Sequence, residues 1–493
     1  MDDAGHELKP LLTVEGWELL NSLPPYQEED AFTLNTRLRE QGHPPEAVAA
    51  ALTQSRLRQE AQQKFGAFAS RMIFTEDGLQ QSTRLPVAAR HAQRFREASV
   101  THVADLGCGL GGDAMTMASL DLKVVAVEAD EATAAAATMN LLPFPEADVL
   151  HTRAEDFMRD HRPLPEGWGL WLDPARRDPA GARGADGAAA RIWDPEAFSP
   201  PLSFVTELAA TGLPMGVKLG PGLPHELIPE SCEAEWVSID GSVVELVLWF
   251  NAAARPGVRR CATVLRTAGR ETRAPEAAAP EPTEAAEAEN AGPETTERDS
   301  RQRNGETAGG GADNLRAAEL TSSRDFGTHP ESQSPGTGVP VRGRAGLTGI
   351  LWEPDGAVIR AGLVTDLASA LGGHLLDEHI AYFCTDQTNG TGSPMARGFR
   401  ILEVLDFNMK RLRRWAQAEG VASLEIKKRG VDVAPETLRK QLLGGAKRAA
   451  QKKPRSGAGQ EAAERTSRAR TLVLIRIGEE RVAAVVEPLS RPA

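Results

Sequence analysis

The chain has 493 residues and a formal net charge of −13, with 41% hydrophobic and 25% charged residues. This length predicts two or three domains, and the composition is ordinary for a globular protein. The most apolar run, residues 243–250, contains Glu245 and is too short to span a membrane. The N-terminus is acidic and polar, unlike a signal peptide, so we expect a cytoplasmic protein.

The cysteines and histidines do not predict a metal site. Cys108, Cys232, Cys261 and Cys384 are widely scattered, and no C-x-x-C pair occurs. A disulfide framework and a zinc site are therefore not expected. His374 and His379 lie five residues apart, which is not a metal-ligand spacing.

Residues 1–98 are expected to form an N-terminal helical region. Residues 26–40 and 45–65 carry mixed apolar and polar faces, with Pro44-Pro45 at a helix start. Such a region either covers a sheet edge or roofs a bound ligand.

Residues 99–268 alternate short apolar runs with helical segments. This order predicts a parallel sheet with helices on both faces, and Gly241-Ser242 predicts a hairpin that ends it in antiparallel strands. We expect strands at residues 100–106, 123–128, 148–151, 169–172, 214–219, 234–240 and 243–250, with 258–265 as a possible extension.

A glycine-rich turn, residues 105–113, follows the first of these strands. Its sequence is D-L-G-C-G-L-G-G-D, and a helix is expected directly after it. Glycines let backbone N–H groups approach a ligand closely at a helix N-terminus. Gly107, Gly109 and Gly112 match the dinucleotide pattern G-x-G-x-x-G, and Glu128 lies 21 residues after Gly107.

A second interpretation of the same turn is S-adenosylmethionine binding. Asp105, Gly107, Gly109 and Gly111 form D-x-G-x-G-x-G. A carboxylate at Asp105 suits the cationic amino-acid end of that cofactor, whereas it would repel a pyrophosphate. The turn therefore favours S-adenosylmethionine over a nicotinamide dinucleotide.

Further acids follow the next strands. Glu128 ends an apolar strand and is placed to accept hydrogen bonds from ribose hydroxyls. Glu155 and Asp156 follow the strand at 148–151 and are candidates to accept from an adenine amino group. An equal alternative is that both acids are ordinary first-turn helix charges.

Asp173-Pro174 closes the apolar strand at residues 169–172. In open α/β sheets ligands bind at the carboxyl ends of the strands, and proline ends the strand there. Asp173 and Pro174 are therefore the candidate catalytic residues.

With these segments, residues 80–250 resemble a class I S-adenosylmethionine-dependent methyltransferase. More narrowly, the chain resembles bacterial methyltransferase-like proteins with a C-terminal THUMP-like domain. The segments that carry this resemblance, besides the glycine turn, are 81–95 (QSTRLPVAARHAQRF), 173–177 (DPARR) and 426–432 (IKKRGVD). The resemblance implies a Rossmann-like seven-stranded sheet and S-adenosylmethionine as cofactor.

The resemblance also implies direct methyl transfer to a nitrogen. Asp173 would accept a hydrogen bond from the attacking amine, and the Pro174 carbonyl a second one. Methyltransferases that act on amino groups of bases commonly have Asp-Pro-Pro followed by an aromatic residue here. In this chain Ala175 and Arg176 replace the second proline and the aromatic residue. Trp168 or Trp193 are the alternative stacking surfaces.

Arg176 and Arg177 are candidates to clamp an RNA phosphate. Their alternative role is an ion pair with Asp178 or Asp194. Trp171, in the preceding strand, is expected in the core.

Residues 269–345 differ in composition from the rest. Glu, Ala, Pro, Thr and Gly dominate, and large apolar side chains are rare. Such a segment buries too little surface to offset the loss of chain entropy, so a disordered acidic, Pro/Gly-rich linker is expected.

Residues 346–493 are expected to form a small α/β domain with a β-α-β-α-β-β order. The elements expected there are strands at 401–407, 421–427, 471–477 and 481–486, and helices at 408–419 and 435–443.

This region reverses the charge of the chain. Residues 397–455 contain 16 Lys and Arg against 6 Asp and Glu, a local balance of +10. A basic face of this kind is typical of phosphate binding, and THUMP domains are associated with RNA-modifying enzymes. The candidate RNA-binding residues are Lys410, Arg411, Arg413, Arg414, Lys427, Lys428 and Arg429, with Trp415 as a neighbouring aromatic.

The sequence thus favours a methyltransferase acting on tRNA or rRNA. Two alternatives stay open: an RNA-binding protein that has lost catalysis, and a small-molecule methyltransferase. The oligomeric state, the acceptor atom and the RNA class are not specified by these motifs.

Overall fold

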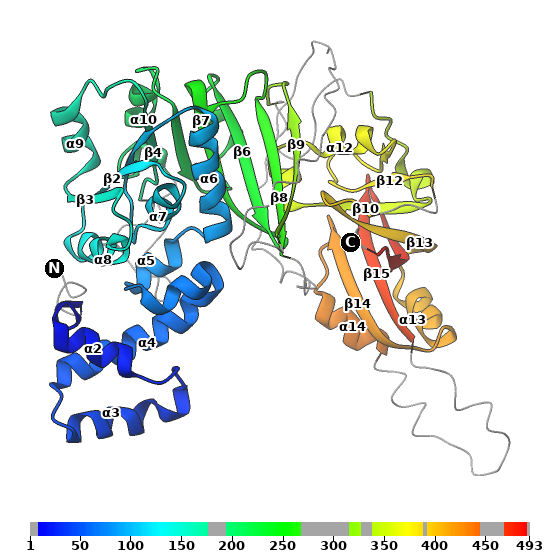
Figure 1. The fold of residues 1–493 in the computed structure, drawn as a ribbon. Helices are drawn as coiled ribbons and strands as arrows, with labels where there is room; N and C mark the ends of the chain where they lie inside the picture. Colours follow the sequence, from blue (N-terminus) through cyan, green and yellow to red (C-terminus); the bar gives the residue numbers. More distant parts are fainter. Residues whose placement is uncertain are drawn as a thin grey trace. The chain divides into compact units, whose positions relative to one another are not determined.

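The fold is that of a computed structural model, and it describes residues 8–175, 194–267, 315–326, 338–387, 392–443 and 468–490. Contacts divide the chain into two compact units (Figure 1). The first unit comprises residues 1–220, 228–233 and 246–256, and the second comprises 221–227, 234–245 and 257–493.

The first unit begins with the helical region that the sequence predicts. Leu57 and Phe65 of α4 share one buried apolar cluster with Met115 and Leu141, which belong to the helices after the glycine turn. The region is therefore part of the same core as the sheet. Its helices are α2 (Val14–Ser22), α3 (Ala31–Glu40), α4 (Pro45–Phe65), α5 (Glu76–Gln81) and α6 (Leu85–Glu97).

Parallel strands and helices then alternate, as expected. Side chains alternate between the faces of a strand: Val103 of β1 belongs to the cluster shared with α7 and α8, whereas buried Ala104 and Leu106 do not. The elements are β1 (His102–Leu106), α7 (Gly112–Ser119), β2 (Lys123–Glu128), α8 (Glu131–Leu141), β3 (Ala147–His151), α9 (Ala154–His161), β4 (Trp168–Leu172), α10 (Leu202–Ala209) and β5 (Met215–Leu219).

The sheet has the order β3-β2-β1-β4-β5-β7-β6-β8-β9. Its first seven positions are the seven strands expected from the sequence. β7 (Ser242–Phe250) runs antiparallel to β5, and Asp240 and Gly241 have positive φ in the turn that joins it to β6 (Cys232–Ile239). β8 (Arg260–Thr267) extends the sheet, as the sequence suggested.

One part of the segment expected to be a disordered linker is a strand. β9 (Leu315–Ser322) pairs antiparallel with β8 along its whole length. Backbone hydrogen bonds to an existing strand edge order a segment that has few apolar side chains, which composition alone does not reveal. Residues 269–314 and 327–337 of the expected linker lie outside the described residues.

The second unit also contains a seven-stranded sheet of order β11-β12-β10-β13-β16-β15-β14. The predicted β-α-β-α-β-β order is present, and strands β10 to β12, absent from the prediction, add to it. The elements are β10 (Ile350–Pro354), α11 (Gly356–Arg360), α12 (Val364–Ala370), β11 (His374–Leu375), β12 (Phe383–Thr385), β13 (Ala396–Asp406), α13 (Met409–Ala418), β14 (Val421–Arg429), α14 (Pro435–Leu443), β15 (Arg468–Ile477) and β16 (Glu480–Pro488).

Both faces of this second sheet are covered. Leu472 and Leu474 of β15 share a buried cluster with Leu412 of α13 and Leu438 of α14. The intervening Val473 belongs to a second cluster, formed with residues 347–384. α13 and α14 therefore pack on one face, as the predicted order implies.

No helix of the described ranges is long and apolar enough to cross a membrane. Within the same ranges, no group of His, Cys, Asp and Glu side chains gathers with the geometry of a metal site.

Candidate functional site

The glycine turn connects β1 to α7 in a conformation that requires glycine. φ is +96° at Gly107, +54° at Gly109 and +82° at Gly111. The amides of Gly107 and Cys108 donate to the Val127 carbonyl, 2.9 and 3.0 Å away, which ties the turn to β2. L-residues with side chains rarely adopt such φ values.

The three glycines differ in what surrounds them. A Cβ added at Gly107 would lie 3.1 Å from the Asp173 carbonyl oxygen, and one at Gly111 would lie 3.2 Å from Leu141. A Cβ at Gly109 would have nothing within 4 Å. The turn is therefore packed on both sides of Gly109 and open at Gly109 itself, where a ligand can reach the backbone.

Glu128 lies beside this open position at the end of β2. Its Oε2 accepts from the Gly109 amide at 3.0 Å, and its Oε1 accepts from the Asp130 amide at 2.9 Å. Burial raises the pKa of Glu128, although these backbone amides oppose the effect. Each carboxylate oxygen keeps a second lone pair for another donor.

Asp105 is the most unusual group of the site. It is 1% exposed, and neither carboxyl oxygen has a hydrogen-bond partner among the described residues. Burial, followed by the charges of Asp113, Asp173 and Glu128, raises the pKa of Asp105 well above its ordinary value. Because an unpartnered buried carboxyl is costly, such a group indicates a cationic or hydrogen-bonding ligand.

Asp173 lies at the carboxyl end of β4, as predicted, and next to the glycine turn. Its amide donates to Leu106 at 3.4 Å, and its Oδ2 accepts from Lys218 Nζ at 2.6 Å. The Lys218 side chain is 7% exposed and Asp173 27%. Lys218 is not predicted as a site residue from the sequence, where its only signal is that it is a lysine inside an apolar strand.

Beyond Asp173 the chain is fixed by a short bridge. Pro174 is buried, and Ala175 and Ser199 exchange two backbone hydrogen bonds of 2.8 and 3.1 Å. Arg176 and Arg177, with Trp193, Asp178 and the alternatives built on them, lie outside the described residues.

Trp168, one of the two tryptophans expected to stack on a base, does not lie near Asp173. It begins β4, at the opposite end of the strand from Asp173, and it stacks on His102 with ring centroids 5.2 Å apart. A strand of five residues separates its two ends by roughly 13 Å. Trp171 is fully buried in the core, as expected.

The segment that follows α5 packs against α7, the helix that begins at the glycine turn. Thr83 Oγ1 donates to Asp113 Oδ2 at 2.8 Å, and His91 Nδ1 lies 2.7 Å from Asp113 Oδ1. Burial alone would raise the pKa of Asp113, but the His91 ring, Lys218 and the Thr83 hydroxyl lower it on balance. These contacts join the end of the helical region to α7, the helix that follows the glycine turn.

A second, partly buried lysine, Lys64, lies near Lys218. Lys64 Nζ donates to the carbonyls of Leu79, Gln80 and Ser82 at 2.7, 2.7 and 2.9 Å. Burial, with the charges of Lys218 and Arg84, lowers the pKa of Lys64 to about 8. It holds the end of α5 and was not found from the sequence.

Glu155 and Asp156 occupy the first turn of α9. Glu155 pairs with Arg153 at 3.2 Å and Asp156 with Arg159 at 2.6 Å. Both ion pairs agree with a helix-end role, and adenine recognition stays a prediction.

The basic residues of the second unit divide between two faces. Lys410, Arg411, Arg413 and Arg414 are exposed on α13, whereas Trp415 is 8% exposed and packs in the core. Trp415 is therefore not available to stack on a base, contrary to the expectation that it lies beside the cations.

Some of these cations have protein partners. Arg411 pairs with Asp406 at 2.6 Å, and Arg413 donates to the Gln441 carbonyl at 3.1 Å. Among the described residues, Lys410 and Arg414 form no ion pair. These two are the exposed charges of α13 that remain available to a ligand.

The second basic cluster lies on strand β14. Lys427 pairs with Glu353 at 2.8 Å and lies over the Phe399 ring. Alternation along the strand places Lys427 and Arg429 on the face opposite α13, and Lys428 on the same face as α13, exposed. The seven predicted residues thus do not form one continuous basic surface, and Lys427 already has a partner.

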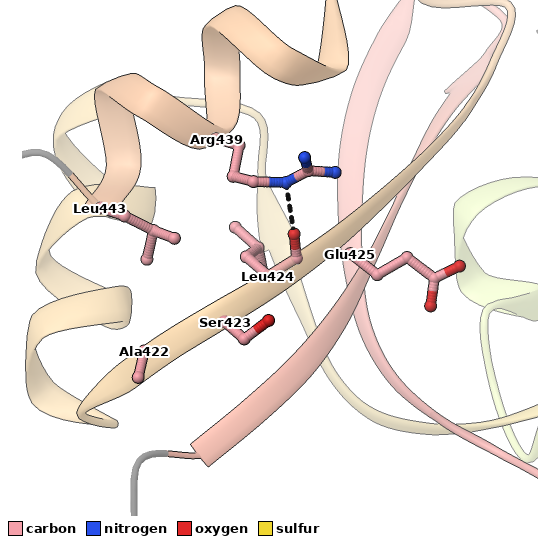
Figure 2. A pocket seen from close by; sticks show the side chains of 6 residues that line it. All are labelled: Ala422, Ser423, Leu424, Glu425, Arg439 and Leu443. Carbon is pink, nitrogen blue, oxygen red and sulfur yellow. Dashed lines mark hydrogen bonds between the residues drawn. The ribbon is translucent and has the colours of Figure 1, made fainter. Parts of the chain in front are cut away.

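A pocket of about 360 Å³ lies at the free edge of β14 (Figure 2). Arg439 Nε donates to the Leu424 carbonyl at 2.7 Å, and its Nη1 lies 2.8 and 2.9 Å from the two Glu436 oxygens. With its cation paired in this way, the pocket adds no candidate to the site. It is lined by Ala422, Ser423, Leu424, Glu425, Arg439 and Leu443.

The first-unit residues fit S-adenosylmethionine. The unpartnered Asp105 carboxyl supplies an acceptor for a cation, and the open side of Gly109 leaves room for a ligand against the backbone. Glu128 provides oxygens of the kind that bind ribose hydroxyls.

Comparisons with known proteins agree with this chemistry. Proteins of Mycobacterium tuberculosis strains CDC 1551 and H37Rv, both named as uncharacterized S-adenosylmethionine-dependent methyltransferases, are each 28% identical over 402 residues. These alignments cover 79% of this chain and 86% of each relative.

Family and structure comparisons extend the match to both ends. Residues 396–488 match the THUMP domain-like family, and residues 6–61 match a domain of unknown function, DUF8688. The crystal structure of a candidate methyltransferase from Porphyromonas gingivalis W83 is 18% identical with a TM-score of 0.57, and the match covers 95% of this chain and all of that one. The predicted resemblance and fold class are confirmed.

Proposed function

We propose that this chain, a homologue of S-adenosylmethionine-dependent methyltransferases with a THUMP-like domain near its C-terminus, transfers a methyl group from S-adenosylmethionine to RNA. The observation that carries the proposal is the buried, unpartnered Asp105 carboxyl beside the open glycine turn, with Asp173 at the end of the neighbouring strand. A cation-binding group and a hydrogen-bond acceptor at adjacent strand ends are what methyl transfer to an amine requires.

The cofactor-binding residues are Asp105, Gly107, Gly109, Gly111 and Glu128. Asp105 would accept from the ammonium group, and Glu128 from the ribose hydroxyls. Charge-assisted hydrogen bonds of this kind contribute roughly 1.5–3 kcal/mol each. Glu155 and Asp156 are the further candidates for the adenine end.

S-adenosylmethionine supplies an electrophilic methyl group, and the electron pair of the broken S–C bond stays on sulfur. The acceptor nitrogen forms the new N–C bond with its lone pair and releases its surplus proton to solvent. Asp173 Oδ1, which accepts no hydrogen bond from the described residues, orients that nitrogen, assisted by the Pro174 carbonyl. The protein thus contributes alignment and exclusion of water.

The THUMP-like domain supports RNA as the substrate class, and tRNA or rRNA as the first RNAs to test. Lys410, Arg414 and Lys428 are exposed and unpaired among the described residues, so they are the first candidates to contact phosphates. Phosphate contacts position an RNA without reading its sequence.

The deciding experiment transfers tritium from labelled S-adenosylmethionine into fractionated cellular tRNA and rRNA, followed by nucleoside mass spectrometry. We expect label in one RNA fraction, and none with the Asp173→Ala variant. Calorimetric titration with S-adenosylmethionine tests the cofactor separately. RNA binding without cofactor binding would favour the non-catalytic alternative and overturn the proposal.

A further inference from the structure

Lys218 is a buried lysine that the mechanism above does not use. Every residue of β5 is buried, and Lys218 is the second-to-last residue of that strand. Burying an ammonium group costs several kcal/mol unless a partner compensates it. Among the described residues, the Lys218 Nζ donates to Asp173 Oδ2 at 2.6 Å and to the Gln81 carbonyl at 3.4 Å.

We propose that Lys218 is a positioning residue for methyl transfer, which holds Asp173 so that its second oxygen, Oδ1, faces the acceptor nitrogen. The inference rests on the proposed function and deepens it. It assigns a role to Lys218 on strand β5, whereas Asp173 and Pro174, the residues proposed to bind the methyl acceptor, lie on the loop after β4.

The strand register explains why Lys218 can do this. β4 and β5 are parallel, with Leu170 opposite Met215 and Leu172 opposite Val217. Continuing this pairing by one residue places Asp173 opposite Lys218. Asp173 has left the strand, and its own amide makes a long 3.4 Å hydrogen bond. A side chain on the neighbouring strand is therefore its firmest anchor, because strands hold groups more precisely than loops.

The positive charge of Lys218 also stabilises the ionised forms of the carboxyl groups around the turn. Asp105, Asp113, Asp173 and Glu128 gather around the turn, and each disfavours the charge on its neighbours. Lys218 acts in the opposite direction on both Asp105 and Asp113. Without its positive charge, these buried carboxyls would shift further toward their protonated forms.

The pairing also limits the acceptor. An ionised carboxylate can only accept hydrogen bonds, and Oδ1 is the Asp173 oxygen to which Lys218 does not donate. The group it orients must then donate a hydrogen, so the methylated nitrogen is one that carries hydrogen. A ring nitrogen with only a lone pair gains nothing from this arrangement.

The test is a double-mutant cycle assayed with the RNA fraction that accepts label. Because misplacing a reacting group by about 1 Å costs on the order of 100-fold, we expect Lys218→Met to lower kcat by that factor. KM for the RNA should stay within about threefold of wild type, because KM does not report the transition state alone. Lys218→Arg, which keeps the charge, should recover at least about tenfold of the lost kcat.

The cycle separates positioning from simple stabilisation. In the Asp173→Asn background, Lys218→Met should have little further effect on kcat, because its partner is already altered. Arg94→Met is the matched control: Arg94 pairs with fully buried Glu233 at 2.8 Å, away from Asp173. It should lower thermal stability and leave kcat near wild type.

Each outcome decides the matter. No transfer by wild-type protein overturns the proposed function and this inference with it. If the wild type transfers methyl groups but Lys218→Met leaves kcat unchanged, only this inference is overturned. The same holds if the losses of kcat from Lys218→Met and Asp173→Asn multiply in the double variant. If Lys218→Met does not fold, kcat is compared between Lys218→Arg and the double variant, in which both charges of the pair are absent.

Discussion

His91 Nδ1 and Asp113 Oδ1 lie 2.7 Å apart, in a buried position between α6 and the helix that begins at the glycine turn. A carboxylate can only accept, so Nδ1 carries the hydrogen. The pair joins two segments that the sequence analysis singled out separately, residues 81–95 and the turn. The second oxygen of Asp113, Oδ2, accepts a hydrogen bond from the Thr83 hydroxyl.

Asp113→Asn should destabilise the protein by about 2 kcal/mol, because it removes the charged acceptor of the buried hydrogen bond with His91. The pKa of Asp113 is lowered in the fold, so its contribution is present above the unfolded value near 4 and is lost as pH falls below it. Chemical denaturation at pH 3 and pH 7 measures this. A wild-type protein and variant with the same acid dependence would contradict the assignment.

Asp105 should couple cofactor binding to proton release. Its pKa is raised, chiefly by burial, so the fold favours the protonated form, and this contribution is lost as pH rises above about 4. A cationic ligand favours the ionised form. Calorimetric titration with S-adenosylmethionine in two buffers of different ionisation enthalpy should therefore show protons released on binding.

The matching variant is Asp105→Asn. It should weaken S-adenosylmethionine binding by roughly tenfold or more, the equivalent of one charge-assisted hydrogen bond, and abolish the buffer dependence. It should also raise thermal stability at pH 7, because the folded protein no longer has to keep protonated a carboxyl that ionises in the unfolded chain. Binding of equal strength in both proteins would remove Asp105 from the cofactor site.

Gly109→Ala and Gly111→Ala should fail in different ways. Both positions have positive φ, so each variant loses about 1 kcal/mol to backbone strain. The added methyl at position 109 meets no protein atom and occupies the ligand side, whereas at 111 it presses on Leu141. Cofactor affinity should fall in the first variant, and unfolding temperature chiefly in the second.

Which features the sequence revealed depends on how local they are. The turn and Asp173 were found because a strand end, a glycine pattern and a proline are neighbours in the chain. Lys218 lies 45 residues from Asp173, and no periodicity marks that contact. Likewise, β9 was missed because its order comes from pairing with β8, not from its own side chains.

A basic stretch of sequence does not show how its charges are arranged on the folded surface. A run such as Lys427-Lys428-Arg429 counts as three charges in composition, but strand alternation sends them to different faces. Trp415 was expected beside the cations, and helical periodicity instead buries it with Leu412. Only coordinates show which charges already have partners.

The salt dependence of RNA binding tests this division. Lys410→Ala/Arg414→Ala should weaken binding and reduce the slope of log Kobs against log salt by about 1.4, the value for two phosphate contacts with single-stranded nucleic acid. Fluorescence anisotropy with labelled tRNA between about 50 and 200 mM KCl measures it.

The control removes one charge that is already paired. Lys427→Ala breaks the 2.8 Å contact with Glu353 and the packing over Phe399, so it should lower thermal stability while the salt slope stays at the wild-type value. Equal slopes in all three proteins would place the RNA elsewhere on the chain. A slope reduced only by Lys427→Ala would mean that the ligand contacts the face opposite α13, because Lys427 and Arg429 project from that side of β14.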